Sequence, residues 1–313
     1  MAHPGGKGWV MPAASAGVLL LAAASWAFGA QDPDGAGAGA VRFGSSGCVE
    51  YQPGTMPLII TIPHGGTREP ADMPDRISAT QARYDTNSLE LGRALSKAVR
   101  YRTGKTPHVI ITHVHRKKLD TNRDVFEAAQ DDSVAIRTWE EYHGFIEEAK
   151  REVMRRYGTG LLIDLHGHRH HKARIELGYL LMQKELNMPD DSLDAPLYLQ
   201  STSVRALAEQ SGKGLAEIVR GRRSLGTLLT ERGYPAVPSQ RHPGPGADPY
   251  FSGGYTTEQH GSAMGGTISA IQMETPWHGV RDTGAHRKAF ARAAAEALDE
   301  FFKTWFPEGR SKP

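Results

Sequence analysis

The chain has almost no cysteine, since Cys48 is the single one among its 313 residues. No intrachain disulfide can form, so the fold must be held together by its hydrophobic core. A metal site built from cysteine thiolates is disfavoured for the same reason. A thiol nucleophile is disfavoured as well, because Cys48 precedes the first strand that the sequence predicts.

An excess of either charge is also missing, because 37 basic side chains are balanced by 35 acidic ones. No strong field therefore attracts nucleic acid or an anionic membrane. The sequence contains no Gly-x-Ser-x-Gly motif, which disfavours a serine hydrolase. Hydrophobic residues make up only 39% of the chain, alongside 35 glycines and 19 prolines, and this composition predicts a loop-rich protein around a modest core.

Only the N-terminus contains a long apolar run. Lys7 precedes the apolar segment 18–24, and Ala27 and Gly29 provide small residues at a cleavage site, so residues 1–30 are predicted to be a signal peptide. An uncleaved anchor is the alternative. We expect a secreted or extracytoplasmic protein with a flexible linker at 31–50, a single catalytic domain at 51–306 and a tail at 307–313.

Apolar strands alternate with amphipathic helices through this domain. Strands are predicted at 58–63, 109–114, 161–166, 177–182 and 268–273, and helices at 86–100, 136–157, parts of 200–232 and 284–304. Asp85 and Thr86 are candidates to cap the first helix. The alternation predicts an α/β fold with a mixed, mainly parallel central sheet and helices on both faces.

Two of the predicted strands end in histidine. The strand at 58–63 leads into His64, and the strand at 161–166 delivers His166 and, two residues later, His168. Because the carboxyl ends of parallel strands meet at one edge of a sheet, these imidazoles are candidate ligands of one metal. His168 is either a rival ligand or a supporting residue. Most of the remaining histidines in this part of the chain, namely His113, His115, His170 and His171, are expected to face solvent.

Other polar and charged residues suit carboxylate binding and general base catalysis. Asn122 and Arg123 follow Arg116 closely, and guanidinium groups bind carboxylates with two parallel hydrogen bonds. An ordinary solvated run of charges is the alternative. Glu274 ends an apolar strand and is a candidate general base for a metal-activated water.

The order of several short motifs resembles a known family. The motifs are Pro63-His64-Gly65-Gly66, Asp120-Thr121-Asn122-Arg123, Asp164-Leu165-His166-Gly167-His168, Phe251-Ser252-Gly253-Gly254-Tyr255-Thr256 and Ile271-Gln272-Met273-Glu274. Together they resemble the N-formylglutamate amidohydrolase family over about residues 57–300. That family is related in fold to the zinc carboxypeptidases and to aspartoacylase.

The resemblance implies a role for each matched residue. It implies His64 and His166 as ligands of one zinc ion, Arg116 as the group that polarises the scissile carbonyl, Asn122 and Arg123 as the carboxylate-binding pair, and Glu274 as the general base. His168 then becomes a supporting residue. The loop at 253–255, with Gly254 and Tyr255, and Arg174 near Glu176 are expected to shape the acyl or side-chain pocket.

The third metal ligand departs from the pattern of these relatives. The carboxypeptidases use a His-x-x-Glu pair, but Thr67 stands three residues after His64 and the chain contains no His-x-x-Glu. Asp85, just before the first predicted helix, is the preferred third ligand, and Glu69 is the alternative.

These observations predict a zinc-dependent hydrolase that cleaves the amide of an N-acyl amino acid. Its expected partner is a small N-acyl amino acid or peptide-like substrate, with no nucleic acid and no membrane after signal cleavage. A secreted zinc peptidase or peptidoglycan amidase is one alternative, and an inactive binding protein on the same fold is another. The signal peptide argues against N-formylglutamate itself, because its hydrolysis belongs to intracellular histidine breakdown.

Overall fold

The computed structural model describes residues 39–77 and 83–307, which belong to one unit of the chain, Gly37–Pro313. The predicted signal peptide and residues 308–313 of the predicted tail lie outside the described residues. Among the helices of the described ranges, none has the length and apolar character needed to cross a membrane.

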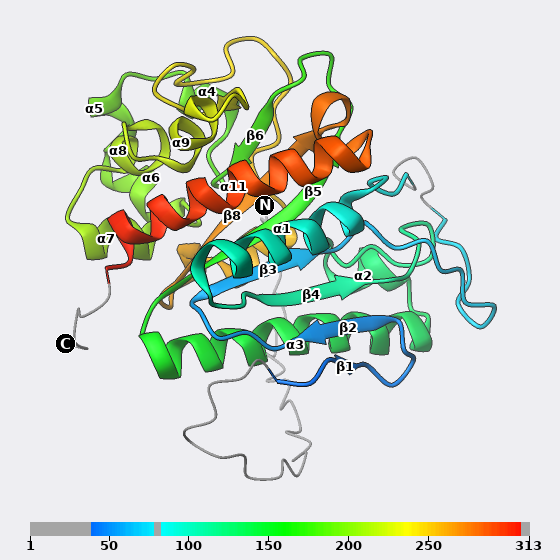
Figure 1. The fold of residues 1–313 in the computed structure, drawn as a ribbon. Helices are drawn as coiled ribbons and strands as arrows, with labels where there is room; N and C mark the ends of the chain where they lie inside the picture. Colours follow the sequence, from blue (N-terminus) through cyan, green and yellow to red (C-terminus); the bar gives the residue numbers. More distant parts are fainter. Residues whose placement is uncertain (1–38, 78–82, 308–313) are drawn as a thin grey trace, which may run out of the picture. The chain divides into compact units, whose positions relative to one another are not determined.

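A sheet of eight strands forms the centre of the unit (Figure 1). The strands are β1 (Arg42–Phe43), β2 (Val49–Gln52), β3 (Leu58–Ile62), β4 (His108–Thr112), β5 (Gly160–His168), β6 (Ile175–Gly178), β7 (Ala236–Val237) and β8 (Ile268–Pro276). Their order is β1-β2-β4-β3-β5-β8-β6-β7. The central strands β4, β3, β5 and β8 run parallel, whereas β2 is antiparallel to β4 and β6 is antiparallel to β8. The predicted mixed, mainly parallel sheet is confirmed.

Helices cover both faces of this sheet. They are α1 (Ser88–Thr103), α2 (Val125–Ala129), α3 (Ser133–Tyr157), α4 (Gln183–Leu186), α5 (Asp190–Leu193), α6 (Pro196–Ser201), α7 (Arg205–Ser211), α8 (Leu215–Arg220), α9 (Leu225–Glu231), α10 (Tyr255–His260) and α11 (Gly284–Trp305), with the short turns η2 (Ser262–Met264) and η3 (Trp277–Arg281). Helices α1 and α11 lie side by side on one face and α3 covers the other (Figure 1).

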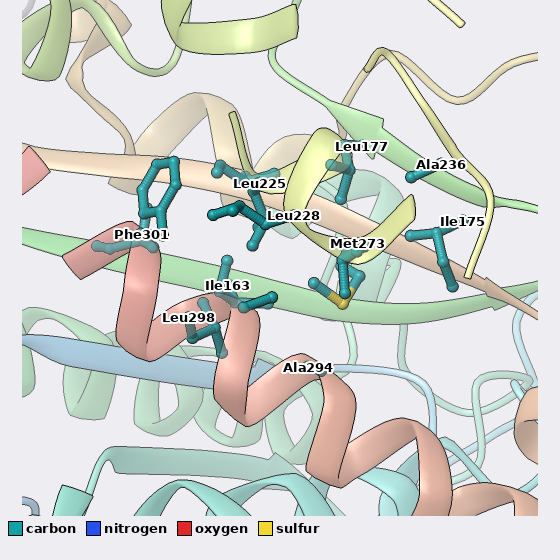
Figure 2. Packing of buried hydrophobic residues seen from close by; sticks show 14 of the residues in the cluster. Ile163, Ile175, Leu177, Leu225, Leu228, Ala236, Met273, Ala294, Leu298 and Phe301 are labelled. Atoms are coloured by element: carbon teal, nitrogen blue, oxygen red, sulfur yellow. The ribbon is translucent and has the colours of Figure 1, made fainter. Parts of the chain in front are cut away.

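The two faces of the sheet are built by the two-residue period of each strand. In β3, Leu58, Ile60 and Ile62 join the core beneath α1 and α11, whereas Ile59 joins the core beneath α3. Figure 2 shows the core beneath α1 and α11 near β5, where Ile163 faces Leu298 of α11. Since both faces are covered, the central strands are buried along almost their whole length and are mainly apolar, as the hydrophobic runs predicted.

The expected linker at 31–50 is partly wrong. Within it, β1 pairs with β2, and β2 begins at Val49 and pairs with β4. Cys48 is buried rather than exposed in a linker. Two very short antiparallel strands complete the sheet edge here, and a glycine- and alanine-rich composition does not reveal such pairing.

Two other boundaries also differ from expectation. Helix α1 begins at Ser88 after Asn87, which has a left-handed backbone (φ 64°), so neither Asp85 nor Thr86 is its N-cap. The strand predicted at 177–182 is β6, Ile175–Gly178. It ends early because Leu180 adopts a left-handed backbone and its N–H donates to the carbonyl of Ser252 instead of a neighbouring strand.

Ile163 tests the contribution of this core, because it is fully buried in the middle of β5. Replacing it with alanine should lower the free energy of unfolding by about 2–5 kcal/mol, from lost apolar burial and the cavity left behind. Ile77, whose side chain is 91% exposed, is the matched control, and Ile77→Ala should stay within about 0.5 kcal/mol of wild type. Denaturant titration measures both. Equal losses would show that the packing described here is wrong.

Candidate metal centre and its surroundings

The candidate site lies where three parallel strands end. Thr61 of β3 pairs with Asp164 of β5, so His64 emerges beside the end of β5. His166 of β5 is in turn the register partner of Glu274 of β8. The pairing of these strands therefore brings the two predicted ligands and the predicted base to one edge of the sheet.

Three ligand atoms converge at this edge. His64, Asp85 and His166 are all buried, and each offers one ligand atom within 4.8 Å of the others. Asp85 Oδ2 lies 3.6 Å from His64 Nδ1 and 3.4 Å from His166 Nδ1. Both imidazoles thus present the same ring nitrogen, Nδ1, to one carboxylate.

The opposite ring nitrogens are held by two further carboxylates. His64 Nε2 donates to Asp120 Oδ1 at 2.6 Å, and His166 Nε2 donates to Asp164 Oδ2 at 2.8 Å. A carboxylate behind each histidine is the usual support of a metal-binding imidazole, because it fixes the tautomer and leaves the other nitrogen to bind the ion. His64 Nδ1 is buried without a hydrogen-bond partner among the described residues, which would be costly unless a cation binds there. The donor set therefore fits a metal ion.

The structure brings Asp85, not Glu69, to the two histidines. The backbone N–H of Asp85 donates to the carbonyl of His64, and Asp85 Oδ2 accepts from the N–H of Gly167 at 3.0 Å. Glu69 is instead at the surface and pairs with Lys117 at 2.7 Å. Burial acts to raise the pKa of Asp85, yet the neighbouring imidazoles of His166 and His64 hold it below its usual range.

The raised pKa of His166 affects metal binding. Burial acts to lower its pKa, but Asp164 and Asp85 raise it well above the ordinary value. An ion at this site must displace a proton from the ring, so metal affinity is expected to increase with pH.

His168 has a structural role. Its Nε2 donates to the carbonyl of Arg174 at 2.8 Å, and its Nδ1 accepts from the N–H of His170 at 3.1 Å. Both nitrogens are thus used by the backbone. His168, His170 and Glu176 form a second group of ligand-type residues, but these bonds and the Arg174 guanidinium 3.4 Å from Glu176 oppose a cation there.

The expectation that most of the four other histidines face solvent is wrong. Only His171 is largely exposed, with 65% of its side chain accessible. His113 donates to Glu50, His170 donates to Glu176, and His115 is partly buried. Each lies where a carboxylate or a packed loop covers it, which strand alternation alone does not predict.

Asp120 is the centre of the polar network and was not assigned a role from sequence. Besides His64, it accepts from Arg116 Nε at 2.8 Å and from the N–H of Asn122 at 3.1 Å, and Arg76 lies 3.6 Å away. Burial acts to raise its pKa, but His64 and Arg116 hold it well below the usual range. Its place in the Asp-Thr-Asn-Arg motif was the signal that could have identified it.

The predicted substrate-binding residues divide into two sets. Asn122 Nδ2 lies 3.4 Å from His166 Nε2. Asn122 Oδ1 accepts from the N–H of Thr256 at the start of α10. Gly254 must be glycine, because a Cβ there would lie 2.5 Å from Asn122 Nδ2. Tyr255 begins α10 and contacts the ring of Trp139.

The two predicted arginines lie further out. Arg123 is partly exposed, with Nε 3.9 Å from Asp120 and 3.5 Å from Glu127. Arg174 binds Glu176, Asp248 and the carbonyl of Pro249.

Glu274 is buried beside His166, and burial raises its pKa to about 8. Gln272 Nε2 donates to its Oε1 at 3.0 Å. The carboxyl is therefore poised to exchange a proton near neutral pH, which a general base requires.

Arg281, which sequence reasoning also missed, ties the segments of the site together. Its buried guanidinium donates to the carbonyls of Thr86 at 2.6 Å, His168 at 2.9 Å and Thr275 at 3.1 Å. These carbonyls follow Asp85, His166 and Glu274 by one or two residues. A Cβ on Gly167 would lie 2.2 Å from the guanidinium carbon, so this glycine makes room for the clamp.

The raised pKa of Glu274 predicts a pH-dependent effect of Glu274→Gln in metal-free protein. The folded-state pKa of about 8 exceeds the ordinary value of 4.5 for a glutamate, so the stability that the protonated carboxyl contributes is complete below pH 4.5 and is lost as pH rises through 8. Between these values, the unfolding free energy of wild type should fall relative to that of the variant by up to about 1.4 kcal/mol per pH unit. Urea titrations at several pH values measure the difference. A difference independent of pH would contradict the assignment.

No protein-family model matches the chain, and no curated protein matches it in sequence. Solved structures do match. The crystal structure of N-formylglutamate amidohydrolase from Ralstonia eutropha shares 15% identity, with 80% of this chain and 94% of that chain covered and a TM-score of 0.49. A gene product of Agrobacterium tumefaciens shares 12% identity, with 84% and 99% covered and a TM-score of 0.50. The chain has the α/β fold of the Agrobacterium protein.

Proposed function

We propose that this chain is a zinc-dependent amidohydrolase that cleaves the amide bond of an N-acyl amino acid or a related carboxylate-bearing amide. One observation carries the proposal. Two histidines, each backed by a carboxylate, present Nδ1 to Asp85 directly beside the buried carboxyl of Glu274. Histidine and carboxylate ligands with a neighbouring base are the arrangement of a catalytic zinc site.

His64, Asp85 and His166 would hold the ion. When bound, zinc supplies a Lewis acid that polarises a carbonyl and lowers the pKa of a water molecule. Asp120 and Asp164 keep the imidazoles in the tautomer that binds a metal.

Glu274 moves the proton of the reaction. Its carboxylate accepts a proton as water adds to the amide carbon, and it donates that proton to the amine nitrogen as the C–N bond breaks. The products are a carboxylate and a free amine. The positive charge of a bound metal ion would lower the pKa of Glu274 below the value that burial produces, which would favour the ionised base at neutral pH.

Arginine and asparagine side chains orient the substrate. Arg116 is aimed by Asp120 and would stabilise the oxyanion that develops on the scissile carbonyl. Asn122 and Arg123 would bind the substrate carboxylate, because a guanidinium can form two parallel hydrogen bonds with it.

A zinc-binding titration tests the ligand set. Wild type should bind one zinc ion per chain, His64→Gln and Asp85→Asn should lose tight binding, and Asp120→Asn should weaken binding by about 10- to 100-fold, because the imidazole loses its supporting carboxylate. Isothermal titration calorimetry measures the affinities. Glu69→Gln is the matched control and should bind like wild type. Loss of zinc in Glu69→Gln, with retention in Asp85→Asn, would overturn the assignment of the third ligand.

Hydrolysis of a panel of N-acyl amino acids and peptides tests the reaction. The zinc-loaded protein should prefer N-acyl amino acids with a free carboxylate, and Glu274→Gln should lower kcat by about 10²- to 10⁴-fold while leaving zinc content unchanged, since only proton transfer is removed. Full activity in a chelated, metal-free sample would refute the zinc mechanism. Preference for peptides or peptidoglycan fragments would favour the peptidase alternative. Binding without turnover would indicate an inactive member of the fold.

A further inference from the structure

A second chain of hydrogen bonds lies behind the proposed carboxylate-binding loop. Glu147 Oε1 and His260 Nδ1 are 2.8 Å apart, and His260 Nε2 and His143 Nδ1 are 2.7 Å apart. His143 Nε2 then lies 3.1 Å from the carbonyl oxygen of Thr121. Both histidines are buried, and Glu147 is the partly exposed end of the chain.

The three contacts require three protons. A carbonyl oxygen only accepts, so His143 Nε2 must carry hydrogen. His143 Nδ1 then accepts from His260 Nε2, and a further proton must lie between His260 Nδ1 and Glu147. Two neutral imidazoles and an ionised carboxylate supply only two protons. The complete chain therefore holds one additional proton, and without it one of the three contacts has no hydrogen.

The last hydrogen bond of this series, at Thr121, supports the loop that contains the proposed carboxylate-binding residues Asn122 and Arg123. Thr121 lies between Asp120 and Asn122, and Trp139, one helical turn before His143 on α3, donates its indole N–H to the carbonyl of Arg123 at 2.9 Å. The centroid of the His143 ring lies 4.1 Å from that of the Trp139 ring and 5.5 Å from that of the Tyr255 ring. The packing thus links α3, α10 and the Asn122–Arg123 segment.

We propose that Glu147, His260 and His143 form a proton-holding relay that positions the Asn122–Arg123 pair for the substrate carboxylate. This inference rests on the proposed function for its substrate, but not for its hydrogen bonds. The three residues are positioning residues, because they reach the substrate only through Thr121 and its neighbours. Loss of the additional proton releases one contact and loosens the grip on the loop.

Burial and the surrounding charges together determine how firmly this proton is held. Burial lowers the pKa of both imidazoles, and the Glu147 carboxylate opposes this effect at each ring. At His260, Asp164 also opposes the lowering, whereas Lys150 adds to it. A charge on His260 further lowers the pKa of His143. Burial acts to raise the pKa of Glu147, yet His260 and Lys150 lower it to about 2. The extra proton is therefore held on the imidazoles at acidic pH and is lost as pH rises.

Glu147→Gln separates a proton-holding relay from a merely structural cluster. A glutamine amide donates to His260 Nδ1, so all three contacts are satisfied by neutral rings at every pH. In the zinc-loaded protein, the KM of wild type for an N-acyl amino acid should rise several-fold relative to the KM of Glu147→Gln between pH 5 and 8. His260→Gln should raise KM about tenfold at all pH values, with kcat within about twofold of wild type, because only substrate positioning is lost.

Two controls accompany these variants. His108→Gln removes another buried histidine, which bonds to Tyr51 and to the N–H of Gly54 outside the relay, and should leave KM unchanged at every pH. In ¹⁵N spectra of the imidazole nitrogens, the His143–His260 pair should carry three protons at pH 5 and two at pH 8 in wild type, but two at both values in Glu147→Gln.

The spectra and the amide hydrogen exchange of residues 120–123 need no substrate, so they distinguish failure of the relay from failure of the proposed function. Faster exchange in His260→Gln than in His108→Gln is expected. The relay is overturned if the pair carries two protons at every pH, if Glu147→Gln follows the pH profile of wild type, or if His260→Gln changes neither exchange nor KM.

Discussion

Parallel pairing of β3, β5 and β8 is the constraint on which the site depends. Parallel strands end at the same edge, and their register sets which residues meet there. The pairing of Thr61 with Asp164, and of His166 with Glu274, brings one candidate ligand from the end of each of two strands and a carboxyl from a third into one buried volume. A shift of one residue in either pairing would turn these side chains to the opposite face of the sheet.

The buried volume contains an unusual amount of charge, and its stability depends on how that charge is paired. Asp85, Asp120, Asp164 and Glu274 are all buried together, and burying a charge is costly unless it is paired and hydrogen-bonded. Imidazoles and Arg116 provide partners for the three aspartates. Glu274 receives only a glutamine amide, and burial raises the pKa of its carboxyl. A bound cation would complete the balance.

Support for the site comes from elements that contribute no ligand. Arg281 holds three backbone segments at the sheet edge, and α3 presents Trp139, His143 and Glu147 at four-residue spacing toward the Asn122 loop and α10. The rigid parts of the fold thus set the position of loops that carry the chemistry.

The sequence alone determined the features that local periodicity encodes: the apolar strands, the helices at 136–157 and 284–304, and the histidines and glutamate at strand ends. These follow from residues a few positions apart, so a one-dimensional pattern contains them. The choice of Asp85 over Glu69, the Asp120–His64 bond, the structural bonds of His168 and the pairing of His143 with His260, 117 residues later, were decided only by tertiary structure. Such contacts depend on register, on how loops cross the sheet edge and on which carboxylate reaches which ring nitrogen, and no spacing along the chain records that geometry.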